Sequence, residues 1–290
     1  MAVNPVLGVI GGSGIYDIPS LRNAKELKIS TPFGEPSSPI LVGELSGKKV
    51  AFLARHGIGH VFLPSEVNYC ANIYAFKSIG VTRIVSISAC GSLRQDFSPG
   101  HIVIPDQLVD FTHKRQRTFF GDGIVAHIGA AQPYCKNMSQ MLSQALQQTK
   151  TRTHLGGAYI TIEGPRFSTK AESNLYREWG MSIIGMTSSP ETFLAREAEI
   201  CYTTMAHVTD YDVWHTSEEP VTVEMVIEVL KKNTGVAIQA IENLVNLLPV
   251  QWDCECQHTL KNAIMTQSEK IPSQVISKLG IIVEKYLRSK

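Results

Sequence analysis

Six short polar motifs each follow a run of apolar, strand-like residues, and this repeated placement constrains the fold more than any other feature. In open α/β sheets, ligands bind where the carboxyl ends of the strands converge, so we expect the six motifs to meet at one site. Five motifs offer hydroxyls, a guanidinium or bare backbone N–H groups, which suit an anion. The last offers two carboxylates, which suit a heterocyclic base or its exocyclic amine, so one pocket for a phosphate and a heterocycle is the simplest interpretation. The motifs are Gly11-Gly12-Ser13-Gly14, Arg55-His56-Gly57, Ser88-Ala89-Cys90-Gly91-Ser92, Glu163-Gly164-Pro165-Arg166-Phe167-Ser168, Met186-Thr187-Ser188 and Thr209-Asp210-Tyr211-Asp212.

The apolar runs alternate with amphipathic segments, which predicts a single α/β domain with a mixed central sheet flanked by helices. Strands are expected at residues 6–10, 50–54, 84–88, 102–105, 159–162, 182–186 and 200–206. Helices are expected at 65–78 with Ser65 as its N-cap and Gly80 after its end, at 137–149, from a capping box at 188–191 to about residue 199, and at 222–248.

A change of composition after Pro249 divides the chain into a main domain, residues 1–249, and a C-terminal extension, residues 250–290. Residues 251–271 are polar and predict a loop, and residues 273–287 predict one more helix. An additional subunit contact is a hypothesis for the apolar side chains of that helix, which are Ile276, Leu279, Ile282, Val283 and Tyr286.

Charge and hydropathy exclude several classes of protein. The 27 basic and 26 acidic residues are spread along the chain without a basic block, so we expect no nucleic-acid partner. No apolar stretch approaches the roughly 20 residues that span a bilayer, so we expect no membrane partner. The first residues lack the charged and apolar regions of a signal peptide, so a cytoplasmic location is expected.

Six cysteines do not form a disulfide framework at this length. Cys70, Cys90, Cys135 and Cys201 are expected to be free thiols in a reducing compartment. Cys254 and Cys256 form a C-x-C pair that we expect to be two exposed thiols, with a redox or metal role as the alternative. A lone C-x-C supplies too few ligands for structural zinc, and glycines separate His56 from His60, so no metal site is expected.

An anion site is the first chemistry that the motifs support. Glycines after the first strand let backbone N–H groups approach an oxyanion, and Ser13 adds a hydroxyl. Arg55 offers the planar fork that binds phosphate bidentately, although a surface ion pair would be the preferred explanation if this arginine stood alone. Ser88 and Thr187 each stand at a strand end and are expected to complete the ring of donors, and His56 is expected to donate to phosphate or to a ribose hydroxyl.

Asp210 and Asp212 are two residues apart on an extended segment, so their side chains are expected to face one side. A turn at the surface would also account for such a pair. At a strand end beside the anion site, however, a carboxylate can accept from an exocyclic amine, and its protonated form can donate to a ring nitrogen.

The ordered set of motifs resembles the trimeric purine nucleoside phosphorylases, and among them the 5′-methylthioadenosine phosphorylases. The resemblance covers approximately residues 6–248 and includes the intervening Thr31-Pro32-Phe33-Gly34 and Gly121-Asp122-Gly123. It implies a pentosyltransferase that cleaves 5′-methylthioadenosine with inorganic phosphate as co-substrate and without a cofactor. It also implies a homo-oligomer, either a trimer or a hexamer.

The resemblance assigns a role to each candidate residue. The implied phosphate site consists of Ser13, Arg55, His56, Ser88, Ala89 and Thr187. The implied base and ribose site consists of Phe167, Ser168, Met186, Asp210 and Asp212. The implied 5′-methylthio pocket consists of Val223, Val226, Ile227 and a His127 lent by a neighbouring subunit.

Asp210 is the expected catalytic acid, which protonates purine N7 as the base departs while phosphate attacks C1′. Burial beside Asp212 is expected to raise its pKa. The nearest alternative is a phosphorylase for 6-oxopurine nucleosides, which would favour an amide donor such as Asn over Asp210 and Asp212. A methylthioinosine phosphorylase, a nucleoside-binding protein without catalysis and a hydrolase are further alternatives. A water nucleophile needs no ring of phosphate donors, and the six motifs are intact.

Overall fold

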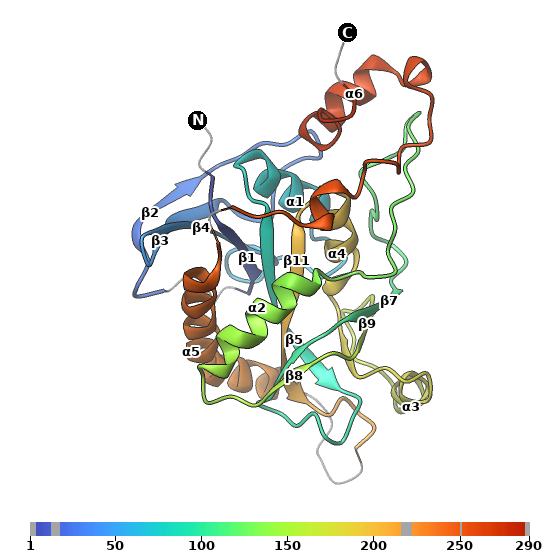
Figure 1. Ribbon diagram of the computed structural model, residues 1–290. Coiled ribbons are helices and arrows are strands. Elements are labelled where there is room, and N and C mark those ends of the chain that lie inside the picture. Colours follow the sequence, from blue (N-terminus) through green and yellow to red (C-terminus); the bar gives the residue numbers. More distant parts are fainter. Residues whose placement is uncertain (1–3, 13–17, 216–221, 250, 288–290) are drawn as a thin grey trace.

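A mixed sheet of eleven strands forms the centre of the molecule in the computed structural model, which describes residues 4–12, 18–215, 222–249 and 251–287 (Figure 1). The strands are β1 (Leu7–Gly11), β2 (Arg22–Leu27), β3 (Ile40–Leu45), β4 (Lys48–Ala54), β5 (Arg83–Ser92), β6 (Ile102–Ile104), β7 (Gln107–Phe111), β8 (Thr153–Leu155), β9 (Ala158–Ile162), β10 (Ile183–Gly185) and β11 (Cys201–Asp210). The helices are α1 (Tyr69–Ser78), α2 (Lys136–Gln147), α3 (Lys170–Glu178), α4 (Ser188–Glu197), α5 (Val223–Leu247) and α6 (Ser273–Leu279). The expected α/β class is confirmed.

Strand β5 organises the sheet. It pairs in parallel with β1 on one edge and with β11 on the other, and its last residues pair with the antiparallel β10. Strand β10 pairs with Gly91 and Ser92 of β5 on one side and with β9 on the other, so its three residues lie beside the carboxyl end of β5. The residues that follow β10 therefore reach the same place as the carboxyl ends of β1, β4, β5 and β11, although β10 runs the opposite way.

All seven expected strands are present, and four others are not anticipated by the sequence pattern. Strand β5 continues to Ser92, so the Ser88–Ser92 motif lies within a strand instead of a loop. The unanticipated strands are β2, β3, β7 and β8. In β2 every residue but the last is exposed, so no apolar alternation marks it as a strand.

Two helix starts differ from the prediction. The N-cap of α1 is Asn68, whose side chain accepts from the Ala71 N–H, and not Ser65. The expected capping box at 188–191 is also wrong, because Ser189 precedes a proline and is extended, with φ −105° and ψ 139°. The carboxylate of Glu191 instead bonds to a buried arginine, as described below.

The C-terminal extension packs on the main domain, and Figure 1 shows it in red, running past α4 and α1. Its helix is shorter than expected, because α6 ends at Leu279 and Gly280 adopts φ +47°. Leu279, Ile282 and Val283 are buried in the chain's own core, so they cannot form the subunit contact hypothesised for them. Glu199, after α4, accepts from Leu260 N–H and from the side chains of Lys285 and Tyr286, which ties the extension down.

Leu279→Ala is expected to destabilise the protein by about 2–5 kcal/mol, because it removes a side chain that is 1% exposed and leaves a cavity. Urea denaturation measures the loss. Met265→Ala is the matched control in the same extension, since Met265 is 65% exposed, and it should cost less than about 0.5 kcal/mol. Equal stability of the two variants would show that the extension does not contribute to the core.

No helix among the described residues is long and apolar enough to cross a membrane.

Candidate functional site

The six motifs meet at one cavity of about 790 Å³, at the carboxyl ends of β1, β4, β5 and β11 and beside α5. The predicted site residues that line it are Arg55, His56, Ser88, Ala89, Phe167, Ser168, Met186, Thr187, Asp210 and Asp212. Ser13 lies outside the described residues, although its neighbour Gly12 lines the cavity. The side chains of Val223, Val226 and Ile227 also lie outside the part that the structure describes.

Arg55 is buried and bound by a carboxylate that sequence reasoning missed. Its Nε donates to Glu191 Oε2 at 2.7 Å and its Nη2 donates to Oε1 at 2.9 Å, with both side chains almost fully buried. Ser86 Oγ and the Ile87 carbonyl accept two further N–H groups. The expectation that the guanidinium of Arg55 is free to bind phosphate bidentately is therefore wrong. Four of the five guanidinium hydrogens are used within the described residues, and one on Nη1 remains for a ligand.

His56 lies against the cavity as a neutral ring. Burial and the nearby charge of Arg55 lower the pKa of His56 to about 4. Its Nδ1 is 2.9 Å from the carbonyl oxygen of Phe62, which can only accept, so Nδ1 carries the hydrogen. Nε2 then offers a lone pair. His56 accepts from a hydroxyl in this state, which differs from the expected donor.

Several buried polar atoms on the cavity wall have no partner of normal hydrogen-bond geometry within the described residues. They include Ser88 Oγ, both ring nitrogens of His207 and the amide nitrogen of Asn233 on α5. A buried polar atom without a partner costs free energy, and binding a ligand removes that cost. His207 and Asn233 were not anticipated, because neither belongs to one of the six motifs.

The two aspartates stand at the end of β11, and both are buried. Thr209 Oγ1 donates to Asp210 Oδ2 at 2.6 Å, and the Asp212 N–H donates to Oδ1 at 2.7 Å. Burial nevertheless raises the pKa of Asp210 to about 6, and the charge of Asp212 adds to this. Burial also raises the pKa of Asp212. The expected raised pKa of Asp210 agrees with the structure.

Gly91 on β5 lets these carboxylates approach the sheet. A Cβ atom at position 91 would lie 2.9 Å from Asp210 Oδ1 and 3.2 Å from Asp212 Cβ. Any side chain there would displace both acids, so the glycine is required for close approach.

Arg115 fastens the motifs behind the cavity, and no sequence pattern marked it. Its Nη1 donates to the carbonyls of Met186 and Ser189, its Nη2 to the carbonyl of Glu163, and its Nε to the Glu163 carboxylate. The glutamate also accepts from backbone N–H groups of residues 113 and 114. The first residue of the fourth motif is therefore a support for the site and does not line the cavity.

Apolar side chains form the remaining wall, from the loop after β4 and from α5. Val61 and Leu63 in that loop are 65% and 44% exposed beside the cavity, and Ala237, Ile238 and Ile241 face it from the helix. His127 does not line this chain's cavity; its side chain is exposed, and its backbone N–H donates to the Ala263 carbonyl.

Comparison with known proteins identifies close relatives. The family model described as the phosphorylase superfamily matches residues 6–246. The chain is 49% identical over 280 residues to S-methyl-5′-thioadenosine phosphorylase of Koribacter versatilis, which covers 97% of this chain and 96% of that protein. A crystal structure of methylthioadenosine phosphorylase from an antarctic soil metagenomic library superposes with a TM-score of 0.92 at 45% identity, covering 97% of this chain and 99% of that one. The Schistosoma mansoni methylthioadenosine phosphorylase in complex with adenine has a TM-score of 0.83 at 36% identity, covering 89% and 96%.

Proposed function

This chain belongs to the phosphorylase superfamily, and on that premise we propose that it cleaves 5′-methylthioadenosine with phosphate into adenine and 5-methylthioribose 1-phosphate. One observation carries the proposal. A single cavity joins two buried carboxylates of raised pKa to a wall of anion-compatible donors and to an apolar wall. These three surfaces match the base, the phosphate and the methylthio group of that reaction.

At the phosphate end, we assign the donors to Ser88 Oγ, the last Nη1 hydrogen of Arg55, Thr187 and backbone N–H groups near Gly12 and Ala89. Ser13 belongs to this set by resemblance. The neutral His56 Nε2 accepts from a hydroxyl of monohydrogen phosphate or of the ribose. Because Glu191 neutralises Arg55, hydrogen bonds and not net charge bind the anion.

At the base end, Asp212 and Ser168 are assigned to the exocyclic amine of adenine and Phe167 to the ring face, with Met186 against the ribose. A carboxylate accepts from the 6-amino group. A 6-oxo base offers an acceptor there and would face the two carboxylates unfavourably. The site therefore favours adenine over hypoxanthine.

At the 5′ end, the apolar side chains of α5 exclude a charged phosphate and suit a thioether. Val223, Val226 and Ile227 are proposed for this pocket. We further propose a homo-oligomer, a trimer or a hexamer, in which His127 of each chain reaches a neighbour's cavity. The exposure of His127, Val61 and Leu63 supports this assembly.

The mechanism follows from the charges that develop at the glycosidic bond. As the bond breaks, the ribose becomes cation-like and the purine gains electrons. Asp210, protonated, donates its hydrogen to N7 of the departing base, and bound phosphate stabilises the ribosyl cation before its oxygen attacks C1′. The fixed positions of both groups supply most of the acceleration. Because the products carry adenine and the methylthio group, we place the reaction in cytoplasmic purine and methionine salvage.

Release of free base tests the proposal, with methylthioadenosine, adenosine, inosine and methylthioinosine assayed side by side, with and without phosphate. We expect phosphate-dependent release of adenine from methylthioadenosine, and slower reaction of both inosines. Preference for the inosines would contradict the assignment of the base site alone. Release without phosphate would indicate a hydrolase, and no release from any of them would indicate a binding protein.

The pH profile is expected to report Asp210. Since only the protonated acid can donate, and its pKa is raised to about 6, kcat/KM should fall as pH rises above about 6, by about tenfold per unit. The measurement uses phosphate at saturation throughout. The residual activity of Asp210→Asn should not show this fall of kcat/KM above about pH 6. If the same fall remained in that variant, a group other than Asp210 would be responsible for it.

A further inference from the structure

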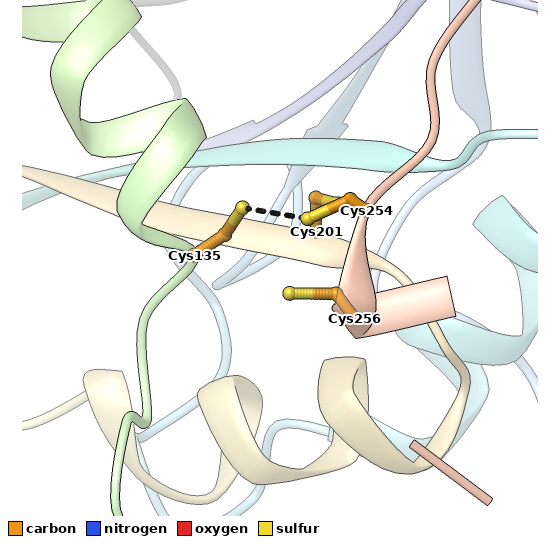
Figure 2. Close-up of side chains that lie close together, drawn as sticks. All are labelled: Cys135, Cys201, Cys254 and Cys256. Carbon is orange, nitrogen blue, oxygen red and sulfur yellow. Dashed lines mark hydrogen bonds between the residues drawn. The ribbon is translucent and has the colours of Figure 1, made fainter. Parts of the chain in front are cut away.

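Four cysteines from three distant parts of the chain come together where the C-terminal extension meets α2 and β11 (Figure 2). This cysteine cluster consists of Cys135 at the start of α2, Cys201 at the start of β11, and Cys254 and Cys256 in the extension. Cys256 is buried and Cys254 is half-buried, so the expected pair of exposed thiols is wrong. None of the four lines the cavity described above.

The spacing of the sulfurs suits a tetrahedral metal. All four Sγ atoms lie within 4.8 Å of one another, and those of Cys135 and Cys254 are 3.6 Å apart. Four thiolates at about 2.3 Å from a zinc ion stand about 3.8 Å from each other. A disulfide would need about 2.05 Å between two sulfurs. The fold thus adds two ligands to the C-x-C pair, which alone supplied too few.

Donors around the cluster favour thiolates. Trp252 Nε1 donates to Cys201 Sγ at 3.1 Å, and Asn137 Nδ2 to Cys254 Sγ at 3.9 Å. Cys135 is the N-cap of α2, so its sulfur lies at the positive end of the helix dipole, and it makes no side-chain cap bond there. Such outer contacts orient ligands and stabilise their charge.

A buried cation beside the cluster lacks a carboxylate partner within the described residues. Arg83 pairs with Cys201 across β5 and β11, and its guanidinium lies over the Trp252 ring at 4.8 Å. Its Nη atoms donate to the carbonyls of Val6 and Pro249, and its buried Nε has no partner there. Four thiolates around a divalent ion carry a charge of −2, of which Arg83 would offset one unit.

We propose that the cysteine cluster binds one zinc ion as a tetrathiolate and so fastens the C-terminal extension to α2 and β11. On binding, Zn²⁺ replaces four thiol protons, which pass to solvent, and no oxidant or reductant takes part. Zinc suits four sulfur ligands in a tetrahedral site, and a site without an open position is structural. The ion is remote from the nucleoside cavity and does not enter the reaction.

Metal analysis of the full chain tests this. Protein purified with reductant and without chelator is expected to contain one zinc per chain by elemental mass spectrometry. Cys254→Ser alone and together with Cys256→Ser should lower this to background, while Cys70→Ser, a buried cysteine outside the cluster, should retain it. Circular dichroism and methylthioadenosine phosphorolysis confirm that the variants are folded.

A second measurement on wild-type protein covers the case in which those variants fail to fold. After the zinc is removed with a chelator, Co²⁺ should produce the visible absorption bands of a tetrahedral thiolate and protect four thiols from alkylation. A wild-type chain that takes up neither ion would overturn the proposal. So would zinc retained by the double variant, or a disulfide within the cluster found by mass spectrometry after alkylation during lysis. Each outcome is independent of whether the enzyme prefers methylthioadenosine.

Discussion

Asp210→Asn is expected to lower kcat for methylthioadenosine by about 10²–10⁴-fold and to change KM little, because asparagine cannot donate an acid proton to N7. The amide has the shape of the carboxyl group. Its oxygen can accept from the Asp212 N–H, and its NH₂ can donate to Thr209 Oγ1, whose own hydrogen can turn to the Cys90 carbonyl. The fold should therefore survive, and the loss should fall on the chemical step.

The matched comparison is Asp212→Asn, because the two aspartates share one strand end but are assigned different roles. Asn replaces one carboxylate oxygen by an NH₂ donor, so it accepts less well from the exocyclic amine and can donate to a 6-oxo group. The substitution should raise KM for adenine nucleosides more than it lowers kcat, and should reduce the preference for adenosine over inosine. Steady-state kinetics with both nucleosides separates the two effects. A near-normal kcat in Asp210→Asn would remove Asp210 from the acid role.

Glu191→Ala is expected to destabilise the protein by about 3–5 kcal/mol, because it leaves the buried Arg55 charge without its partner. Burial acts to lower the pKa of Arg55, but the charge and hydrogen bonds of Glu191 raise it, so the arginine stays charged. Tyr202 also loses its acceptor, since its hydroxyl donates to Glu191 Oε1 at 2.8 Å. Urea denaturation measures the change in the free energy of unfolding.

An exposed pair with the same fork geometry provides the control. Arg94 donates from Nε and Nη2 to both oxygens of Asp96 at 2.8 Å, but the two side chains are 47% and 55% exposed. Asp96→Ala should therefore cost less than about 1 kcal/mol. If the two substitutions lowered the free energy of unfolding equally, burial would not explain the contribution of the Arg55–Glu191 pair to stability.

Sequence patterns were sufficient where one local signal determines the structure. Strands such as β1 and β4 are apolar runs that end in polar motifs, and the aspartates at the end of β11 could be assigned to one site on that basis. Chain neighbours do not reveal partners that are far apart, and Glu191 is 136 residues from Arg55. Pattern reasoning therefore assigned the glutamate to a capping box and treated both arms of the arginine as free for phosphate.

The same limit applies to the supporting network and the extension. Arg115 acts mainly through the backbone carbonyls of Glu163, Met186 and Ser189, which follow β9 and β10, and any residue type supplies a carbonyl, so the sequence does not reveal these partners. The polar stretch after Pro249 correctly predicted a loop, but only the fold shows that Cys256 is buried against Cys135 and Cys201.

Strand β5 has a consequence for how this enzyme can diversify. Ser88, Ala89 and Gly91 pair with β11, and Gly91 also pairs with β10, so their backbone has little freedom to shift and make room for a new side chain. Ile238 and Ile241 project into the cavity from a helix that is not part of the sheet. Laboratory evolution toward nucleosides with other 5′ substituents should therefore select substitutions in α5, while the residues of β5 that line the cavity stay the same.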